Sequence, residues 1–285
     1  MISPHIQTIP ASAPAYPRAL FDLDVRPDPL YAIGRLDALQ MPLVSIVGTR
    51  DATGYGLRST RSIASAFARN GVAIVSGLAR GIDAAAHRAA LDCDGSTIAV
   101  LGTGVDVPYP VGHTELHRAI SERGLVVSES GTGKRAHKGA FPKRNRIIAA
   151  LSEVTIVVEA GHKSGAQITA RQVLDLGRTL ACVPGPIDSP QSSGTNQLLR
   201  DGAHVIATVE DALTLAGVKR VRQAQPIDLG DNDARVWSAI GGETLSIDTI
   251  AARSKLGTRE CLVSVTALEL NGLVESLITG EVRRR

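Results

Sequence analysis

The stretch LVSIVGTRDATGYGLRSTRSIASAFARNGVAIVSGLARGIDAAAHRAAL, residues 43–91, decides the fold. The apolar run Leu43–Val47 stops at a glycine turn, and a helical pattern follows from about Gly56 to Asn70. A second apolar run, Ala73–Val75, stops at another glycine turn and leads into the small-residue helical pattern Asp83–Leu91. Strand, glycine turn and helix, repeated at once, is how a doubly wound parallel sheet begins.

The alternation of strand and helix signals continues to about residue 216. Further strands are predicted over residues 98–101, 125–127, 154–158, 180–183 and 204–206. Helices are predicted over residues 113–123, 144–151, 165–176, 196–200 and 209–215. The strands are short and rich in Val and Ile, which is typical of a sheet with both faces covered. We therefore predict an α/β fold, a Rossmann-like doubly wound and mostly parallel sheet, over residues 41–216.

The two ends of the chain differ from this domain. Residues 1–40 are rich in proline and are predicted to form an irregular arm. The pattern lapses over residues 217–231, which we interpret as a linker. Over residues 232–285 we predict helices at 233–240, 247–254 and 258–271, then a hairpin of strands 273–277 and 280–284. Three helices followed by a hairpin indicate a small winged-helix domain.

Composition limits the class of protein. The chain has 285 residues, a net charge of +3 and only 3% aromatic residues, so the core is expected to be mostly aliphatic. The longest apolar runs are too short to cross a membrane, and no secretory signal pattern opens the sequence. Three widely separated cysteines fit neither a metal site nor a disulfide framework. We expect a cytoplasmic protein with no membrane contact and no metal.

Familiar catalytic and cofactor motifs are absent. The turn at residues 48–54 lacks the G-x-G-x-x-G spacing of a dinucleotide site, and the second strand ends in Ser76-Gly77 rather than an acid. Gly133-Lys134 is followed by Arg135, where a P-loop needs Ser or Thr. Ser164 lacks the G-x-S-x-G frame of a nucleophile elbow. The sequence therefore predicts no catalytic residue and no cofactor.

Anion binding is the chemistry that remains. Three turns between a strand and a helix combine glycine with hydroxyl or basic side chains, and backbone amides at a helix N-terminus suit phosphate. The alternative is that the glycines serve tight turns and the basic side chains are merely solvated. The residues concerned are Gly48, Thr49 and Arg50; Ser76, Gly77, Ala79, Arg80 and Gly81; and Lys163, Ser164 and Gly165.

A basic segment, GTGKRAHKGAFPKRNR at residues 131–146, contains no acid and has Phe141 among its cations. Cationic side chains around an aromatic ring suit single-stranded nucleic acid, whose phosphates meet charge while a base stacks on the ring. A solvated loop in which Phe141 plugs the core is an equal alternative. Asn145 and Arg146 could instead hold the neighbouring loops by hydrogen bonds. The candidates here are Lys138, Phe141, Lys143, Arg144, Asn145 and Arg146.

Two further polar residues have plain structural interpretations. His87 follows three alanines on a helical stretch and is interpreted as a buried, hydrogen-bonded histidine rather than a catalyst. Glu159 ends the fifth predicted strand, where it could be a catalytic carboxylate or a loop anchor.

In the C-terminal segment, Arg253, Lys255 and Arg259 could contact a DNA backbone or form an ordinary polar face.

The ordered motifs of the chain resemble those of a known family. From about Leu43 to Ala212, the chain carries in this order the motifs IVGTR, GVAIVSGLARGIDAAAH, TIAVLGTGVDVPYP, VVSES, FPKRNRIIAALS, VVEAGHKSGAQITA and VPGPIDSPQSSGTNQLLRDGA. In these motifs the sequence resembles the DNA processing protein A (DprA/Smf) family.

This resemblance implies a protein that binds single-stranded DNA, protects incoming DNA and loads RecA recombinase onto it in natural transformation and recombination. It also implies a homodimer formed through the Rossmann-like domain, a C-terminal winged helix and no catalytic reaction. Carried over by position, Arg50 should bind a phosphate, Lys138 should lie in the basic pocket and Phe141 should stack on a base. Many members carry an N-terminal SAM-like domain, and the short arm here puts the functions of that domain in doubt.

Two other function classes stay open. A nucleotide-binding or nucleoside-monophosphate-processing enzyme of Rossmann-like fold would use similar phosphate loops. Such enzymes carry P-G-G-x-G-T and a glutamate, but residues 159–166 read EAGHKSGA. A transcriptional regulator would rest on the winged helix alone and would prefer duplex DNA.

Overall fold

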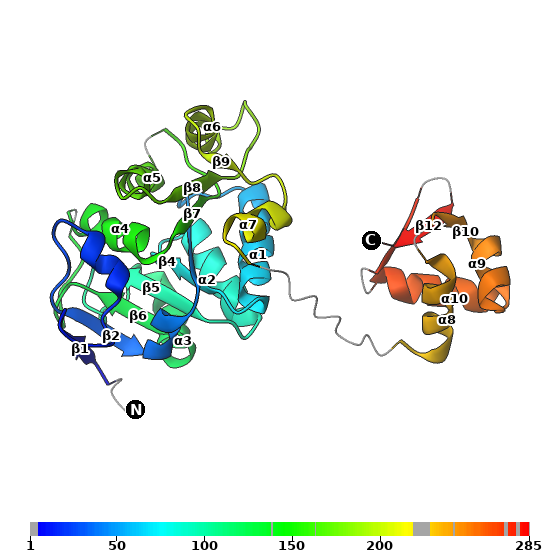
Figure 1. Ribbon diagram of the computed structural model, residues 1–285, viewed down its shortest axis with the longest axis horizontal. Helices are drawn as coiled ribbons and strands as arrows, with labels where there is room; N and C mark the ends of the chain where they lie inside the picture. Colours follow the sequence, from blue (N-terminus) through cyan, green and yellow to red (C-terminus); the bar gives the residue numbers. More distant parts are fainter. Residues whose placement is uncertain are drawn as a thin grey trace. The chain divides into compact units, whose positions relative to one another are not determined.

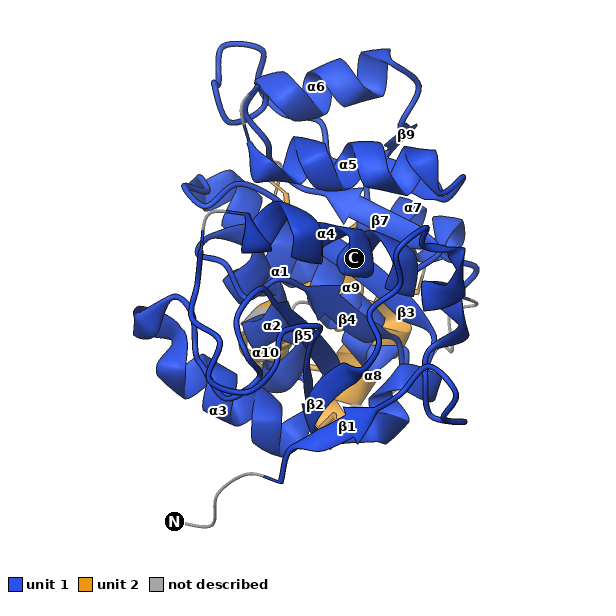
Figure 2. Ribbon diagram, turned by 90° about the vertical axis from the view of Figure 1, so that its left-hand side faces the viewer, with its two compact units in different colours: residues 1–221 blue, residues 222–285 orange. Residues whose placement is uncertain are grey.

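The computed structural model describes residues 5–137, 139–162, 164–218, 229–241, 243–270, 273–277 and 280–284. Its internal contacts divide the chain into two compact units, residues 1–221 and 222–285 (Figure 2). Each unit has its own sheet and its own buried apolar core, as separate domains do.

One mixed sheet forms the centre of the first unit (Figure 1). Within the described residues its strand order is β1-β2-β6-β5-β4-β3-β7-β8-β9, and every pairing from β6 to β9 is parallel. The strands are β1 (Gln7–Ile9), β2 (Leu30–Gly34), β3 (Leu43–Val47), β4 (Ala73–Ser76), β5 (Thr97–Leu101), β6 (Leu125–Ser128), β7 (Val154–Val157), β8 (Thr179–Cys182) and β9 (His204–Val205).

Helices cover both faces of this sheet (Figure 1). On one face lie α1 (Gly54–Arg69), α2 (Ile82–Asp92), α3 (Thr114–Arg123) and α7 (Val209–Leu215). On the other lie α4 (Ala140–Leu151) and α5 (Gly165–Asp175), with α6 (Ser193–Arg200) beside α5. The predicted doubly wound α/β fold is confirmed.

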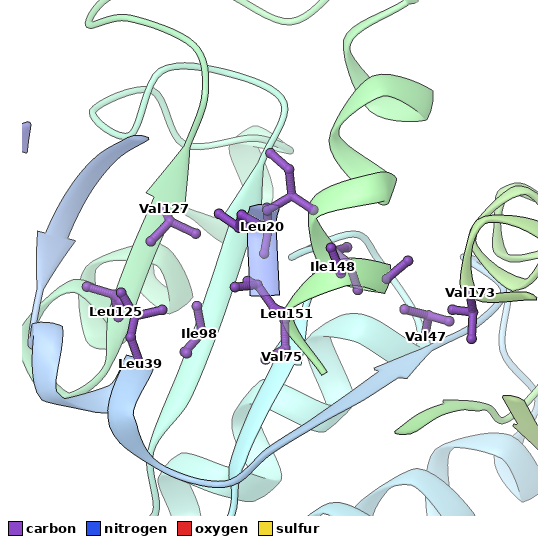
Figure 3. Close-up of a cluster of buried hydrophobic side chains, with 14 of the residues drawn as sticks. Leu20, Leu39, Val47, Val75, Ile98, Leu125, Val127, Ile148, Leu151 and Val173 are labelled. Atoms are coloured by element: carbon purple, nitrogen blue, oxygen red, sulfur yellow. The ribbon is translucent and has the colours of Figure 1, made fainter. Parts of the chain in front are cut away.

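Alternating strand residues supply the two halves of the core. In β3, Val44 and Ile46 pack toward α1, whereas Val47 packs toward α4 and α5. Figure 3 shows the second cluster, in which Leu20, Ile148 and other aliphatic side chains meet. Apart from Phe67, the largest fully buried side chains of the described residues are Leu and Ile, so the core is mostly aliphatic, as the composition predicts.

The prediction that residues 1–40 form an irregular arm was wrong. β2 pairs antiparallel with β6, and β1 pairs antiparallel with β2, so the N-terminal residues add two strands to the sheet. The hydroxyl of Tyr16 donates a 2.5 Å hydrogen bond to the carbonyl of Pro27, and Leu20 is fully buried. The strands were missed because they are short and flanked by prolines, which edge positions tolerate.

Helix α4 begins at Ala140, one turn earlier than the predicted start at Arg144. The sequence Phe141-Pro142 suggested a break, but proline is tolerated in the first turn of a helix because that turn needs no amide donor. The earlier start matters because it places Phe141 on a helix rather than in a free loop.

The second unit has the predicted three helices and hairpin, with a short extra strand that was not predicted. Its sheet order is β10-β12-β11, and its core includes Val236, Ile250 and Val282. The predicted helix end at Asn271 and most of the predicted linker, residues 219–228, lie outside the described residues. The elements are α8 (Asp231–Ile240), β10 (Leu245–Ser246), α9 (Ile247–Ser254), α10 (Thr258–Leu270), β11 (Val274–Ser276) and β12 (Glu281–Arg284).

Candidate nucleic-acid interface

A cavity of about 680 Å³ lies at the carboxyl edge of the sheet, where β3 and β7 are neighbours. The chain leaves β3 toward β4 on one side, and β7 leads to β8 on the other, so this is a topological switch point. Open α/β sheets bind their ligands at such points. This main cavity is lined by Val47, Gly48, Thr49, Arg50, Asp51, Ala79, Asp83, Phe141, Pro142, Arg144, Asn145, Ile148, Gly161, Ser164, Gly165, Ala166, Ile168 and Thr169.

The three predicted turns therefore meet, although not every predicted residue reaches the cavity. Gly77 and Arg80 line a second cavity that adjoins Phe141. Among the described candidates, Ser76, Gly81, Lys143 and Arg146 line neither cavity. Lys138 and Lys163 lie outside the described residues.

Glu159 anchors the turn that follows β3. Its backbone carbonyl accepts the Thr49 amide at 2.7 Å, and its buried carboxylate accepts the amide and the hydroxyl of Thr53 at 2.9 and 2.5 Å. Thr53 in turn caps α1 by accepting the Gly56 amide. Of the two interpretations of Glu159, the geometry favours the loop anchor, and the anchor fixes the backbone that carries Arg50.

The amides of the turn that follows β4 already donate to a side chain of α2, the helix that follows this turn. The carboxylate of Asp83 accepts the amides of Gly77 and Ala79 at 3.1 and 3.3 Å. The hydroxyl of Ser76 donates to the carbonyl of Ile46 at 2.6 Å. The amides of Gly77 and Ala79 are therefore already satisfied within the protein, so these two residues stay predicted members of the site only through the cavities that they line.

Gly81 is needed where this turn enters α2. Its φ is +74°, and an added Cβ would lie 2.8 Å from the carbonyl oxygen of Arg50. The glycine thus lets the two turns touch backbone to backbone, and the amide of Ile82 donates to the carbonyl of Thr49 at 3.2 Å. Gly81 thus serves the packing of the two turns and lines neither cavity.

Arg144 is buried, with 5% of its surface exposed, and serves the frame of the site. Its guanidinium donates to the carbonyl of Gly77 at 2.7 Å and to that of Val100. Burial lowers the pKa of Arg144 to about 10, opposed by the nearby charge of Asp83. The pKa of Asp83 is raised, chiefly by burial, with Arg144 opposing the shift. Arg144 lines both cavities while its hydrogen bonds go to the protein.

The other cations of the basic segment divide by what they meet. Arg146 and Lys143 both pair with Glu129, at 2.5 and 3.1 Å, so their charges are partly neutralised away from the cavity. Asn145 lines the main cavity and donates to the carbonyl of Gly165 at 3.4 Å, which ties α4 to α5. The sequence alone assigned these residues to one patch, and the structure separates them.

Phe141, Arg50 and Tyr109 lie together where the two cavities adjoin. The guanidinium carbon of Arg50 lies 5.7 Å from the centroid of the Phe141 ring. The rings of Tyr109 and Phe141 are 5.1 Å apart and tilted by 34°. Arg50 is exposed, Phe141 is half-buried, and no carboxylate lies within ion-pair distance of Arg50 in the part of the chain that is described.

Tyr109 was not singled out from the sequence. The signal was present in the motif TIAVLGTGVDVPYP, where a Tyr-Pro pair follows a predicted strand. Nothing in that pattern shows that the tyrosine meets Phe141, which is 32 residues away, because the contact joins the connection that follows β5 to the helix that follows β6, and those strands are neighbours in the sheet.

His87 fits its structural interpretation. Its Nδ1 lies 2.7 Å from the hydroxyl of Thr97, and burial lowers its pKa to about 3, so the ring is neutral near pH 7. Among the described residues, no three His, Cys, Asp or Glu side chains gather in a way that could hold a metal ion. None of the described helices is long and apolar enough to span a membrane.

In the second unit, the cluster around α9 and α10 is mixed in charge. Arg253 pairs with Glu243 at 2.9 Å, and Arg259 is exposed. On α10, Leu262 and Val263 are exposed by 46% and 65%. A helix that reads duplex DNA presents polar and cationic side chains to base edges, so this face lacks the expected character.

Comparison with known proteins places the chain in a family. The family model for DNA recombination-mediator protein A matches residues 7–217, and that for the DprA winged helix domain matches residues 221–278. The chain belongs to the DprA family. The C-terminal winged helix is thereby shown as well.

Relatives of the DprA family match over much of their length. The putative DNA processing protein DprA of Mycobacterium tuberculosis is 40% identical over 86% of this chain, which spans 66% of that relative. Protein Smf of Escherichia coli is 35% identical over 99% of this chain and 78% of its own length.

Two solved structures share the fold. DprA from Streptococcus pneumoniae is 39% identical with a TM-score of 0.71, over 73% of this chain and 74% of its own. DNA processing protein A from Helicobacter pylori, solved for its single-stranded DNA binding mode, is 33% identical with a TM-score of 0.69, over 76% of this chain and 98% of its own.

Proposed function

We propose that this chain is a single-stranded DNA-binding protein, without catalytic activity, that acts in DNA recombination. One observation carries the proposal: the exposed Arg50, which pairs with no carboxylate among the described residues, and the Phe141 ring lie together on the wall of the main cavity. Arginine binds phosphate, and an aromatic ring stacks on any base. Together they suit a flexible single strand, whose bases are free to stack, better than a duplex, whose bases are already stacked.

The frame around these two residues supports the same proposal. Arg50 lies on a turn that is held by Glu159 and by the backbone of Gly81, and Phe141 lies in the first turn of α4. Preorganised contacts bind at a smaller entropic cost than flexible ones. Lys138, Lys163, Ser164 and Gly165 remain predicted members of the pocket.

The finer role follows from the family. We propose that the protein protects incoming single-stranded DNA and loads RecA recombinase onto it during natural transformation and recombination. We also propose a cytoplasmic homodimer joined through the Rossmann-like unit. The support is the family membership and the Helicobacter pylori relative described by its single-stranded DNA binding mode.

The alternative function, a nucleotide-processing enzyme, finds no support at Glu159, the residue best placed to be its catalytic carboxylate. A nucleoside-monophosphate hydrolase needs a carboxylate free to act at the sugar, and both oxygens of Glu159 are hydrogen-bonded to Thr53.

The test is a binding titration with labelled single-stranded and duplex oligonucleotides over a salt series. We expect tighter single-strand binding by the unaltered protein. Arg50→Glu should weaken it and reduce the dependence of log affinity on log salt by about 0.7 per lost phosphate contact. Phe141→Ala should lower the binding free energy by about 1–3 kcal/mol.

The matched control is Arg69→Glu, which makes the same charge change on an exposed residue at the far end of α1. It should bind as the unaltered protein does. Equal affinity for single strands and duplexes, or binding untouched by both pocket variants, would overturn the proposal. RecA loading is then tested by the rate of RecA filament formation on single-stranded DNA, which the unaltered protein should raise and Arg50→Glu should not.

A further inference from the structure

A second cavity of about 320 Å³ adjoins the main one, and Phe141 lies in the lining of both. Arg50, Ala79 and Arg144 are also shared. The rest of the second lining comes from the turn after β4 and from the connection between β5 and α3, a segment that no predicted binding residue occupies. The residues found only in the second cavity are Gly77, Arg80, Leu101, Gly102, Thr103, Tyr109 and Pro110.

Tyr109 is the side chain in this lining best suited to bind a base. The residue is 39% exposed, although its ring contacts that of Phe141. An aromatic side chain left open beside a cavity can stack on a further base, because every nucleic-acid base has a π-face. The tilted Tyr109–Phe141 pair thus presents two adjacent rings with a cavity against each.

The segment that carries Tyr109 is held firmly. The hydroxyl of Thr103 donates to the carbonyl of Val107 at 2.7 Å, and Nε2 of His117 lies 2.8 Å from the carbonyl of Val105. After Tyr109, Nδ1 of His113 lies 2.9 Å from the carbonyl of Leu78, which fastens this connection to the turn after β4. The connection on either side of Tyr109 is therefore anchored, and the Tyr109 ring itself contacts Phe141.

Arg80 supplies charge at the same cavity. Its closest carboxylate is that of Asp51 at 3.9 Å, and the two side chains are 66% and 84% exposed. An ion pair so long and so hydrated contributes little, so Arg80 remains available to a phosphate. Arg50 lines both cavities, and Arg80 is found only in the second.

We propose that the second cavity is a nucleotide subsite, in which Tyr109 stacks on a base and Arg80 binds the adjoining phosphate. The bound single-stranded DNA would cross the Phe141 ring, and Arg50 would lie between the nucleotide in the main cavity and the nucleotide in the second cavity. This inference rests on the proposed single-stranded DNA binding and extends it by one position. A volume of about 320 Å³ is at the small end of ligand cavities, as a single nucleoside requires.

The experiment has two parts, both with the full chain. In the first, oligothymidylates that carry one 5-iodouracil are irradiated in complex with the protein, and the crosslinked peptide is identified by mass spectrometry. We expect crosslinks at Tyr109 and at Phe141 from neighbouring positions of the strand. Crosslinks at Phe141 alone would overturn the proposal.

In the second part, affinity is measured for an oligothymidylate length series. Tyr109→Ala should weaken binding of the longer oligonucleotides by about 5- to 150-fold, the ratio equivalent to about 1–3 kcal/mol for one stacked base. The same substitution should change the affinity for the shortest oligonucleotide that still binds by no more than about twofold, because that oligonucleotide occupies only the main cavity. Phe141→Ala should weaken all lengths.

Two further substitutions separate stacking from packing. Tyr109→Phe keeps the ring and should bind within about twofold of the unaltered protein, whereas Tyr109→Leu keeps apolar contact with Phe141 and should bind as weakly as Tyr109→Ala. Full binding by Tyr109→Leu would show that the tyrosine only supports Phe141 and would overturn the subsite. If the unaltered protein bound no single strand, or Arg50→Glu bound normally, the proposed function would fail instead.

Discussion

Replacing Arg144 with methionine tests whether this cation belongs to the frame of the site. The guanidinium holds the carbonyls of Gly77 and Val100, and its charge offsets part of the cost of ionising Asp83. Arg144 and Asp83 form no direct ion pair, but each charge opposes the cost of burying the other, and removing one of two such buried charges costs up to about 3–5 kcal/mol because the other is left uncompensated. We expect Arg144→Met to lose about that much free energy of unfolding at pH 8.

The loss should depend on pH in a direction set by Asp83. Its pKa is raised in the folded state, chiefly by burial, so the folded form binds a proton more tightly than the unfolded form. Stability from this group is present at low pH and falls as pH rises toward the folded pKa. Without Arg144 that pKa rises further, so the variant should be less impaired at pH 5 than at pH 8.

Urea unfolding followed by circular dichroism measures the loss, and the fluorescence of Trp237 serves as an internal control. Trp237 is the single tryptophan of the chain and lies in the second unit, so its transition should be unchanged. Asp83→Asn in the Arg144→Met background should recover about 1–3 kcal/mol by removing the stranded charge. A loss below about 1 kcal/mol, or the same loss at both pH values, would refute this account of Arg144.

Three further predictions concern other parts of the first unit. Gly81→Ala should lower the free energy of unfolding, measured in a urea titration, by more than about 1 kcal/mol. The control Gly177→Ala should lower it less. Both glycines have positive φ, but only at Gly81 would an added Cβ press on neighbouring backbone. His87, whose pKa is lowered to about 3, should make the free energy of unfolding fall by up to about 1.4 kcal/mol per pH unit on acidification below about pH 6.5, and His87→Gln should remove that part of the slope in unfolding titrations across pH. Burial raises the pKa of Cys182 to about 12, so iodoacetamide at pH 8 should alkylate the half-buried Cys93 first and leave Cys182 unmodified until the protein unfolds, as peptide mass spectrometry would show.

The central fold could be predicted because its signals are local. Apolar runs such as Leu43–Val47, each followed by a glycine turn, gave strands that the structure places where predicted. β1 and β2 were missed because their stability comes from pairing rather than from their own composition: β2 pairs with β6, nearly a hundred residues away in sequence, and β1 pairs with β2.

The candidate site was predictable in its loops and much less so in its individual side chains. Composition could show that residues 131–146 are basic, but Glu129, just before them, neutralises Lys143 and Arg146. Asp83 likewise accepts two amides of its own turn, four and six residues before it, a local contact that the composition of the turn does not reveal. Whether a polar group is free or already satisfied depends on such local and tertiary contacts, and that decides which residues can bind.

The two antiparallel strands at the N-terminus bear on how this protein can be shortened. Composition alone invites a cut at residue 41, where the proline-rich stretch gives way to regular patterning. Such a cut would strip β2 from β6, leave a row of unpaired amides and carbonyls on a sheet edge, and uncover the core that Leu20 and Leu30 seal. Exposed edges of this kind recruit other strands. A version beginning at residue 41 should therefore aggregate on expression, whereas one that keeps Gln7 onward should remain dispersed.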